Sequence, residues 1–321
     1  MPRWSWDFED EPRQKPRPEP VAVPGADPAA ERSPGPSRRE ALVRRRRAVA
    51  LVAALALLAV IVAVASAGSD HSAGTGHAKA PLRAVSRPPT DPEQDEMKAV
   101  RSVLAYTPFV KEGTGTAKEV ALTFDDGPGP FTPQVLSVLE QNHARATFFV
   151  IGRMLRYFGS STVREIEDGD VIGDHTENHP MLAHLPAHEQ HEELFEQIAR
   201  VELLGGRRPV LFRPPYGSFN ATTMRELQRL HLLMVLWSVD TDDYEQPGVP
   251  TIVQRAIEGA HPGAIILMHD AGGQRQQTIE ALPTIIKQLR ARGYKLVTVP
   301  RLLADDPPAH GLPLPPNLSG D

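Results

Sequence analysis

The chain has 321 residues, of which 40% are hydrophobic, and a formal net charge of -5 at pH 7. This length and composition allow one large domain with flanking segments, and the charge gives no indication of a nucleic-acid partner. The chain has no cysteine, which excludes disulfides and thiolate zinc sites.

The amino-terminal segment 1–47 is rich in proline and charge and shows no apolar periodicity through residue 36. Such a sequence buries too little apolar surface to offset the entropy of ordering, so we expect a disordered arm. The arm ends in a cationic block, Arg44 to Arg47.

The segment 48–67 consists of twenty uncharged, mostly aliphatic residues. As a helix rising about 1.5 Å per residue, it matches a hydrocarbon core of about 30 Å and predicts one transmembrane helix. Because basic residues stay on the cytoplasmic side, the arginine block predicts a cytoplasmic arm and an extracytoplasmic remainder. We therefore expect a single-pass protein of the cytoplasmic membrane.

A cleaved export signal is the alternative for this segment. Ala65-Ser66-Ala67 resembles a cleavage site, and Ser37-Arg38-Arg39 faintly resembles a twin-arginine signal. The apolar stretch exceeds the usual length of about 7 to 15 residues, which favours a retained anchor. Cleavage near Ala67 would instead give a secreted protein, and the remainder is exported in both cases.

A Gly, Ser, Ala and Pro-rich stretch at 68–90 predicts an extracytoplasmic linker. The lead-in 91–116 contains a short helix pattern with Pro92 at its first position and an apolar stripe of Met97, Val100, Val103 and Leu104. We expect this helix to pack against the following domain, with a solvated linker helix as the alternative.

From residue 117 to 304, short β-rich runs alternate with helical patterns, which is typical of βα units around a parallel sheet. The seven predicted strands are 120–124, 147–151, 171–173, 209–212, 233–237, 264–268 and 295–299. The predicted helices are 133–142, 162–168, 187–204, 221–230, 251–259 and 278–292, the first capped by Thr132. This pattern predicts an α/β fold, a distorted (β/α)7 barrel, followed by a disordered proline-rich tail at 305–321.

Polar residues follow the carboxyl ends of the predicted strands. They are Asp125 and Asp126, His175 and His179, Arg213, Asp240 and Asp243, and His269 and Asp270. In a parallel barrel these strand ends meet on one face, so we expect these residues to gather there. Asp240 is equally consistent with a loop cap, and Asp270 with a supporting role beside His269.

Two histidines four residues apart, together with a distant carboxylate, form the ligand set of a hydrolytic metal site with open coordination positions. Pro180 disfavours helical backbone at His179, so the pair is expected to span a single turn. An isolated Asp125-Asp126 pair before Gly127-Pro128 is most simply a turn, but the other polar blocks favour a site.

These blocks resemble the polysaccharide deacetylase family, whose NodB homology domain forms carbohydrate esterase family 4, and in particular its peptidoglycan N-acetylglucosamine deacetylases. The resemblance covers about residues 117–301. The blocks, in the family's order, are Thr123-Phe-Asp-Asp-Gly-Pro128, His175-Thr-Glu-Asn-His179, Arg213-Pro-Pro-Tyr216, Asp240-Thr-Asp-Asp243 and Leu267-Met-His269.

The resemblance implies a divalent metal, Zn²⁺ most readily and Co²⁺ as the alternative, held by Asp126, His175 and His179. Asp125 would be the catalytic base, and Arg213 would pair with it, orient it and keep it ionised. Zinc in such a site polarises the acetamide carbonyl and lowers the pKa of water toward about 7.

The resemblance also assigns the remaining roles. The backbone N–H of Tyr216 would stabilise the oxyanion, and Leu267 would line the pocket for the acetyl methyl group. His269 would protonate the leaving amine with help from Asp243. Tyr244 stands where the family usually has tryptophan, so the wall of the substrate groove is expected to differ.

The expected partner is an acetylated glycan polymer. Peptidoglycan N-acetylglucosamine is favoured because a site tethered outside the cytoplasmic membrane meets wall polymer first. Chitooligosaccharides and O-acetylated xylan remain alternatives within the enzyme class. A non-catalytic wall-binding module, or a sensor acting through residues 1–36, is the alternative outside it.

Overall fold

The computed structural model describes residues 92–318. The predicted arm 1–47, transmembrane helix 48–67 and linker 68–90 lie outside the described residues. Within the described part, none of the helices is both long and apolar enough to cross a membrane.

The described residues contain one nine-stranded sheet, with strand order β1-β6-β5-β4-β3-β2-β8-β7 and β9 paired to β2. The strands are β1 (Phe109–Val110), β2 (Glu119–Asp125), β3 (Thr147–Val150), β4 (Val171–Asp174), β5 (Leu211–Phe212), β6 (Leu233–Val235), β7 (Val239–Asp240), β8 (Ala264–His269) and β9 (Lys295–Val297). The ladders are parallel. All seven predicted strands are confirmed, whereas the two-residue strands β1 and β7 are too short to show a sequence period.

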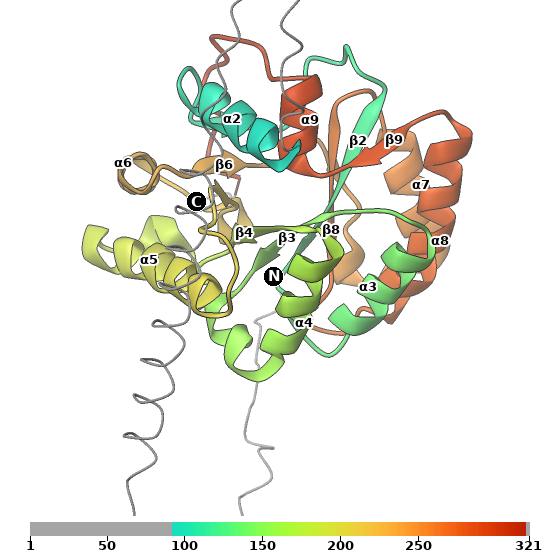
Figure 1. Cartoon of the computed structure of the whole chain (residues 1–321), viewed down its shortest axis with the longest axis horizontal. Coiled ribbons are helices and arrows are strands. Elements are labelled where there is room, and N and C mark those ends of the chain that lie inside the picture. Colours follow the sequence, from blue (N-terminus) through green and yellow to red (C-terminus); the bar gives the residue numbers. More distant parts are fainter. Residues whose placement is uncertain (1–91, 319–321) are drawn as a thin grey trace, which may run out of the picture. The chain divides into compact units, whose positions relative to one another are not determined.

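The sheet is curled. β7 lies at one end of the strand order and β6 beside the other end, yet only residues 236–238 separate these two strands in the chain. In that short connection, Leu236 N donates to Val110 O at 2.7 Å and Ser238 N donates to Ile265 O at 3.1 Å. The connection therefore contacts β1 and β8, so the sheet bends round on itself, with helices outside it (Figure 1), which fits a distorted (β/α) barrel.

The helices are α2 (Pro92–Leu104), α3 (Thr132–Gln141), α4 (Leu155–Asp168), α5 (Ala187–Leu203), α6 (Ala221–Leu230), α7 (Val249–Gly259), α8 (Gln276–Ala291) and α9 (Val299–Asp305). The predicted helices are present, but α4 begins at Leu155 and not at residue 162 as predicted, and α9 was missed. Thr298 caps α9 by accepting from Arg301 N at 3.3 Å. Because proline suits the first turn of a helix, Pro300 is compatible with this start.

The predicted capping role of Thr132 is wrong. Phe131 occupies the N-cap position of α3 and makes no side-chain cap hydrogen bond. The Thr132 hydroxyl instead accepts from Gly129 N at 2.7 Å and donates to Asp270. This hydroxyl is therefore committed to the loop after β2 and to the end of β8, two segments that the local sequence does not connect.

Strand β2 is buried along its whole length. Val120, Leu122 and Phe124 pack in the cluster that includes residues of α3 and α8, and Ala121 faces the other cluster with Phe149 of β3 and Ile265 of β8. Because successive strand residues alternate between faces, Asp125 lies on the inner side with Ala121. The pleat thus directs Asp125 toward the interior of the curled sheet.

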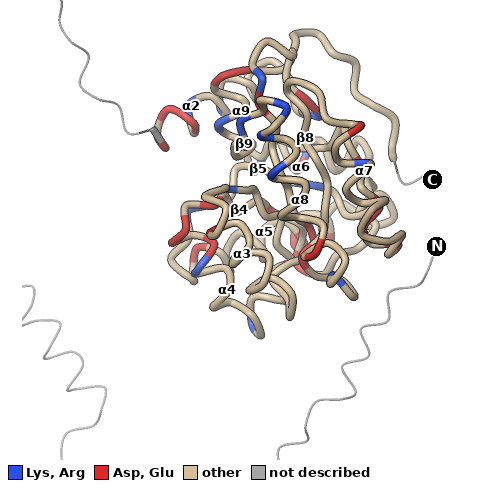
Figure 2. Tube along the Cα trace, turned by 90° about the vertical axis from the view of Figure 1, so that its right-hand side faces the viewer, with Lys and Arg blue, Asp and Glu red and all other residues tan. Residues whose placement is uncertain are grey.

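Helix α2 packs against the domain through its apolar stripe. Val100 and Val103 are each 1% exposed and lie in one cluster with Leu302 and Leu303 of α9. Acidic residues occupy its first turn (Figure 2), where the positive end of the helix dipole favours negative charge. The burial of this stripe supports a packed helix over the solvated alternative.

Candidate active site

Three predicted metal ligands converge after β2 and β4. Asp126, His175 and His179 each offer one ligand atom, and these atoms lie within 4.8 Å of one another. His179 Nε2 is 3.1 Å and His175 Nε2 is 3.5 Å from Asp126 Oδ1. Two imidazole nitrogens and one carboxylate oxygen form a ligand set that suits Zn²⁺ and leaves positions open for water and substrate.

The protonation states also fit a divalent cation. His175 Nδ1 lies 2.7 Å from the carbonyl oxygen of Arg213. Because a carbonyl only accepts, Nδ1 carries a proton, and Nε2 is the ring nitrogen left to bind a metal ion. Burial lowers the pKa of His179, although Asp126 opposes this shift. The lowered pKa favours a neutral imidazole. Burial alone would raise the pKa of Asp126, but contacts with His179 and His175 hold it well below its usual value.

The ligands lie on a tightly constrained backbone. Asp126, Thr176 and His179 have φ values of 74°, 68° and 63°, in a region that residues other than glycine rarely adopt. Thr176 N donates to Asp174 Oδ1 at 2.7 Å, and His179 N donates to Thr176 Oγ1 at 2.9 Å. These hydrogen bonds hold the single turn predicted between the two histidines, and such strained backbone persists where its surroundings fix it.

Gly272, in the loop after β8, is a functional residue that sequence reasoning missed. A Cβ atom built on Gly272 would overlap Asp126 Oδ2, and its φ of +71° also disfavours side chains. We expect Gly272→Ala to weaken Zn²⁺ binding by at least about tenfold, because the added methyl group would displace the Asp126 carboxylate. Changes in the residues that support a metal ligand have effects of this size.

A matched control separates the overlap from the backbone effect. Gly311 has a φ of +73° and nothing within 4 Å of a built Cβ. Gly311→Ala should therefore leave Zn²⁺ affinity unchanged. Titration calorimetry on chelator-treated protein measures both variants, and equal affinities would show that Gly272 does not position Asp126.

Asp125 lies beside the metal ligands and is held by Arg213. Arg213 Nη1 donates to Asp125 Oδ1 at 2.8 Å and to Thr123 Oγ1 at 2.8 Å. Arg213 is fully buried, and its Nε donates to Val235 O at 3.1 Å. Burial lowers the pKa of Arg213, with Asp125 opposing this shift. Asp125 Oδ2 lies 3.8 Å from His175 Nε2, so this oxygen faces the metal ligands while Oδ1 is engaged by the guanidinium.

His269 pairs with Asp243 at the end of β8. His269 Nδ1 is 2.7 Å from Asp243 Oδ1, and His269 N donates to Asp243 Oδ2 at 2.9 Å. Thr278 of α8 donates its hydroxyl to Asp243 Oδ2 at 2.7 Å, a contact that no sequence pattern indicated. Burial would lower the pKa of His269, but the charge and hydrogen bond of Asp243 raise it to about 9. Below that pH, His269 carries a proton that it can donate.

In the metal-free protein, we expect the His269 imidazole to titrate with a pKa of about 9. Replacing Asp243 by asparagine removes the negative charge that favours the imidazolium, so the pKa should fall and His269 should lose its proton at a lower pH. NMR titration of the imidazole signals measures both proteins. An unchanged His269 pKa in Asp243→Asn would contradict the assigned cause.

The other predicted residues border the same site. The Tyr216 ring lies 4.6 Å from the His179 ring, edge-on, and the Tyr244 ring lies 5.3 Å from the His269 ring in a similar arrangement. Tyr244 is 37% exposed, so part of this side chain is accessible from solvent. Leu267 is buried on β8, two residues before His269.

Asp270 does not contact His269 as a supporting residue. Its carboxylate accepts from Thr132 Oγ1, and its backbone N donates to Asp125 O at 3.2 Å. A Cβ on Gly127 would lie 2.5 Å from Asp270 Oδ2, so the loop after β2 packs directly on this carboxylate. Burial raises the pKa of Asp270 to about 7. Asp270 therefore links the loop after β2 to the end of β8.

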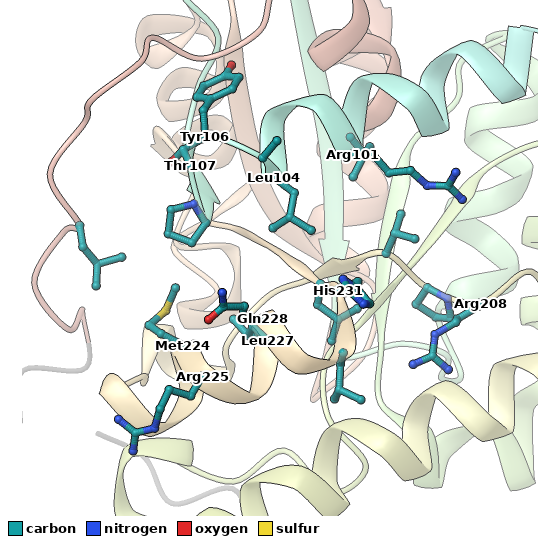
Figure 3. Close-up of a pocket in the computed structure, with 18 residues that line it drawn as sticks. Arg101, Leu104, Tyr106, Thr107, Arg208, Met224, Arg225, Leu227, Gln228 and His231 are labelled. Atoms are coloured by element: carbon teal, nitrogen blue, oxygen red, sulfur yellow. The ribbon is translucent and has the colours of Figure 1, made fainter.

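A large cavity in the described part of the chain lies elsewhere. It has a volume of about 980 Å³ and is lined by residues of α2, α6 and the segments that precede β1, β5 and β6 (Figure 3). These segments precede the strands, whereas the metal ligands and His269 follow or end them. The candidate site therefore lies outside this cavity, toward the opposite ends of the strands.

Comparison with known proteins gives consistent matches. The family described as polysaccharide deacetylase matches residues 112–235. A peptidoglycan-N-acetylglucosamine deacetylase of Bacillus cereus is 38% identical over 216 residues, covering 64% of this chain and 97% of the relative. A chitooligosaccharide deacetylase of Azorhizobium caulinodans is 34% identical over 200 residues, covering 58% of this chain and 95% of the relative.

Solved structures agree with these sequence matches. The Bc1960 peptidoglycan N-acetylglucosamine deacetylase has a TM-score of 0.60 and 35% identity, covering 63% of this chain and 94% of that chain. BA3943, a CE4 family pseudoenzyme from Bacillus anthracis, has a TM-score of 0.58 and 29% identity, covering 61% of this chain and 69% of that chain. On its sequence, fold and site, this chain belongs to the polysaccharide deacetylase family.

Proposed function

We propose that this protein is a metal-dependent deacetylase that hydrolyses the acetamide of N-acetylglucosamine units in peptidoglycan. One observation carries the proposal: the Asp126, His175 and His179 ligand set lies beside Asp125, whose orientation Arg213 fixes. The B. cereus relative named for this activity supports the choice of substrate.

The residues divide the hydrolysis between them. A divalent cation held by Asp126, His175 and His179 would polarise the acetyl carbonyl and favour deprotonation of water. Asp125 accepts a proton from the attacking water as the new C–O bond forms. The backbone N–H of Tyr216 donates to the oxyanion that develops on the carbonyl oxygen.

Collapse of the tetrahedral intermediate breaks the C–N bond and requires a proton on the departing nitrogen. His269 supplies this proton, since its pKa of about 9 keeps it protonated at neutral pH in the metal-free protein. Leu267 offers an apolar surface to the acetyl methyl group. The products are acetate and a glycan with a free amine.

The proposed location follows from the sequence. Residues 48–67 would anchor the protein in the cytoplasmic membrane, with residues 1–47 cytoplasmic and the domain outside. Cleavage near Ala67 would release the domain as a secreted protein. Either location brings the site into contact with cell-wall glycan.

A non-catalytic role is the strongest alternative, because one of the similar structures is described as a pseudoenzyme. The complete set of Asp125, Arg213 and the three ligands favours turnover in this chain. Chitooligosaccharides are the next substrate class, given the A. caulinodans relative. O-acetylated xylan stands third, because the same residues can act on an ester.

Acetate release from purified full-length protein in detergent tests the proposal. Peptidoglycan, chitin oligomers and acetylated xylan are compared with Zn²⁺, with Co²⁺ and with chelator. We expect release from peptidoglycan that requires metal. Release from xylan alone would exclude the proposed substrate, and release that is equal with metal and with chelator would exclude metal catalysis.

A further inference from the structure

The carboxy-terminal tail, residues 307–318, is hydrogen-bonded to the domain at two separate places. At the first, Tyr106 donates its hydroxyl to Pro308 O at 2.8 Å, and its ring stacks on His310 with centroids 3.7 Å apart. Tyr106 lies two residues after the end of α2. This first contact therefore joins the start of the tail to the segment between α2 and β1.

The second contact lies on the loop that carries Tyr216. Leu318 N donates to Gly217 O at 3.2 Å, and Phe219 N donates to Asn317 Oδ1 at 3.3 Å. A Cβ built on Gly217 would lie 2.6 Å from Leu318 Cβ, so the tail packs closely against this glycine. Hydrogen bonds and packing thus both connect the end of the tail to the Tyr216 loop.

Between these two contacts, the tail passes the large cavity. Leu314 contributes to its lining. The lining also includes Leu104 of α2 and Leu227 of α6, which Figure 3 labels. The cavity is therefore lined in part by this chain's own tail. The tail runs from α2 past α6 to the loop before α6.

The Tyr216 loop needs such support. Tyr216 and Gly217 have φ values of 58° and 68°, two consecutive residues in the left-handed region, and Tyr216 is not glycine. Local hydrogen bonds from Gly217 N to Pro214 O at 3.0 Å and from Ser218 N to Pro215 O at 2.9 Å close the turn. The tail adds contacts from a distant part of the chain on the residue next to Tyr216, and backbone of this kind persists when its surroundings over-determine it.

We propose that the tail is a positioning strap, which holds the Tyr216 loop so that the Tyr216 N–H faces the developing oxyanion. This inference rests on the proposed deacetylase function. An oxyanion donor stabilises the transition state only when it is already oriented. Loss of the strap should therefore lower kcat, with little change in KM or in Zn²⁺ affinity, because it affects an interaction made in the transition state.

Two substitutions of one residue test the backbone contact. Leu318→Pro removes the N–H that donates to Gly217 O, whereas Leu318→Ala keeps it. For chitin oligomers or peptidoglycan fragments, whichever the wild type deacetylates, we expect kcat to fall about three- to tenfold in Leu318→Pro, the range of one hydrogen bond. Leu318→Ala should stay within about twofold.

Two further variants complete the series. Leu312→Pro places a proline in the tail at a position where the structure shows no backbone hydrogen bond to lose, so it should behave as wild type. A chain ending at Gly311 removes both Asn317 and Leu318, and its kcat should fall at least as far as that of Leu318→Pro. Zn²⁺ affinity should stay at the wild-type value throughout.

Hydrogen exchange gives a readout that does not depend on activity. The Phe219 amide donates to Asn317, so its exchange should accelerate when the chain ends at Gly311. Unchanged protection of Phe219 would overturn the strap, and so would wild-type kcat in both Leu318→Pro and the truncation. A rise in KM with constant kcat would also overturn it, since the tail would then contact substrate and not position Tyr216. Absence of acetate release by the wild type would count against the proposed function. The exchange rate of the Phe219 amide would still show whether the tail holds the Tyr216 loop.

Discussion

Replacing Asp126 by alanine is expected to abolish Zn²⁺ binding and to lower acetate release by about a thousandfold or more, because the cation contributes several kcal/mol of transition-state stabilisation. Asp126 supplies the only carboxylate among the three clustered ligands of the described residues. Its removal leaves two imidazoles, one protein ligand fewer than a catalytic zinc site uses.

Metal content and activity need to be measured on the same preparations. His188→Ala is the matched control, since His188 is an exposed histidine that pairs with Glu189 outside the ligand cluster. That control should bind Zn²⁺ and release acetate like the wild type. Chelator should reproduce the loss in the wild type, and added Zn²⁺ should reverse it there but not in Asp126→Ala. Full activity of Asp126→Ala would remove the basis for a metal site.

Replacing Asp125 by asparagine is expected to leave Zn²⁺ binding intact and to lower kcat by about 10² to 10⁴, the range for loss of a general base. The amide oxygen of asparagine can still accept from Arg213 Nη1, which donates to Asp125 Oδ1 at 2.8 Å. The amide cannot take a proton from water at neutral pH. The variant therefore separates proton transfer from the architecture of the site.

Asp240→Asn provides the control for loss of a carboxyl group at the same edge of the sheet. Asp240 Oδ1 accepts from Asp242 N at 2.9 Å, a contact within its own loop that an amide oxygen can keep. We expect its kcat to stay close to the wild-type value. Steady-state acetate release together with calorimetric Zn²⁺ titration distinguishes the outcomes. If Asp125→Asn lost Zn²⁺ as well as activity, Asp125 would belong to the ligand set and could not be assigned as the base.

The amino-acid sequence by itself determined most elements of the fold, although not β1, β7 or α9, and the order of the polar blocks. Strands such as 120–124 and 264–268 are recognisable because burial on both faces of a parallel strand requires a continuous apolar run. Placement of His175 and Asp126 on one face followed from the rule that parallel strands end together. These are local patterns, or direct consequences of strand direction.

Only the tertiary structure decided which side chains support that site. Thr278 donates to Asp243 across 35 residues of chain, and Thr132 donates to Asp270 across 138. In the sequence, Gly272 cannot be distinguished from other loop glycines. Only the fold shows that the Asp126 side chain packs against it. The contact between Leu318 and Gly217 is of the same kind. Periodicity and turn chemistry report on neighbours in sequence, whereas these contacts depend on how the sheet curls and on which loops its strand ends bring together.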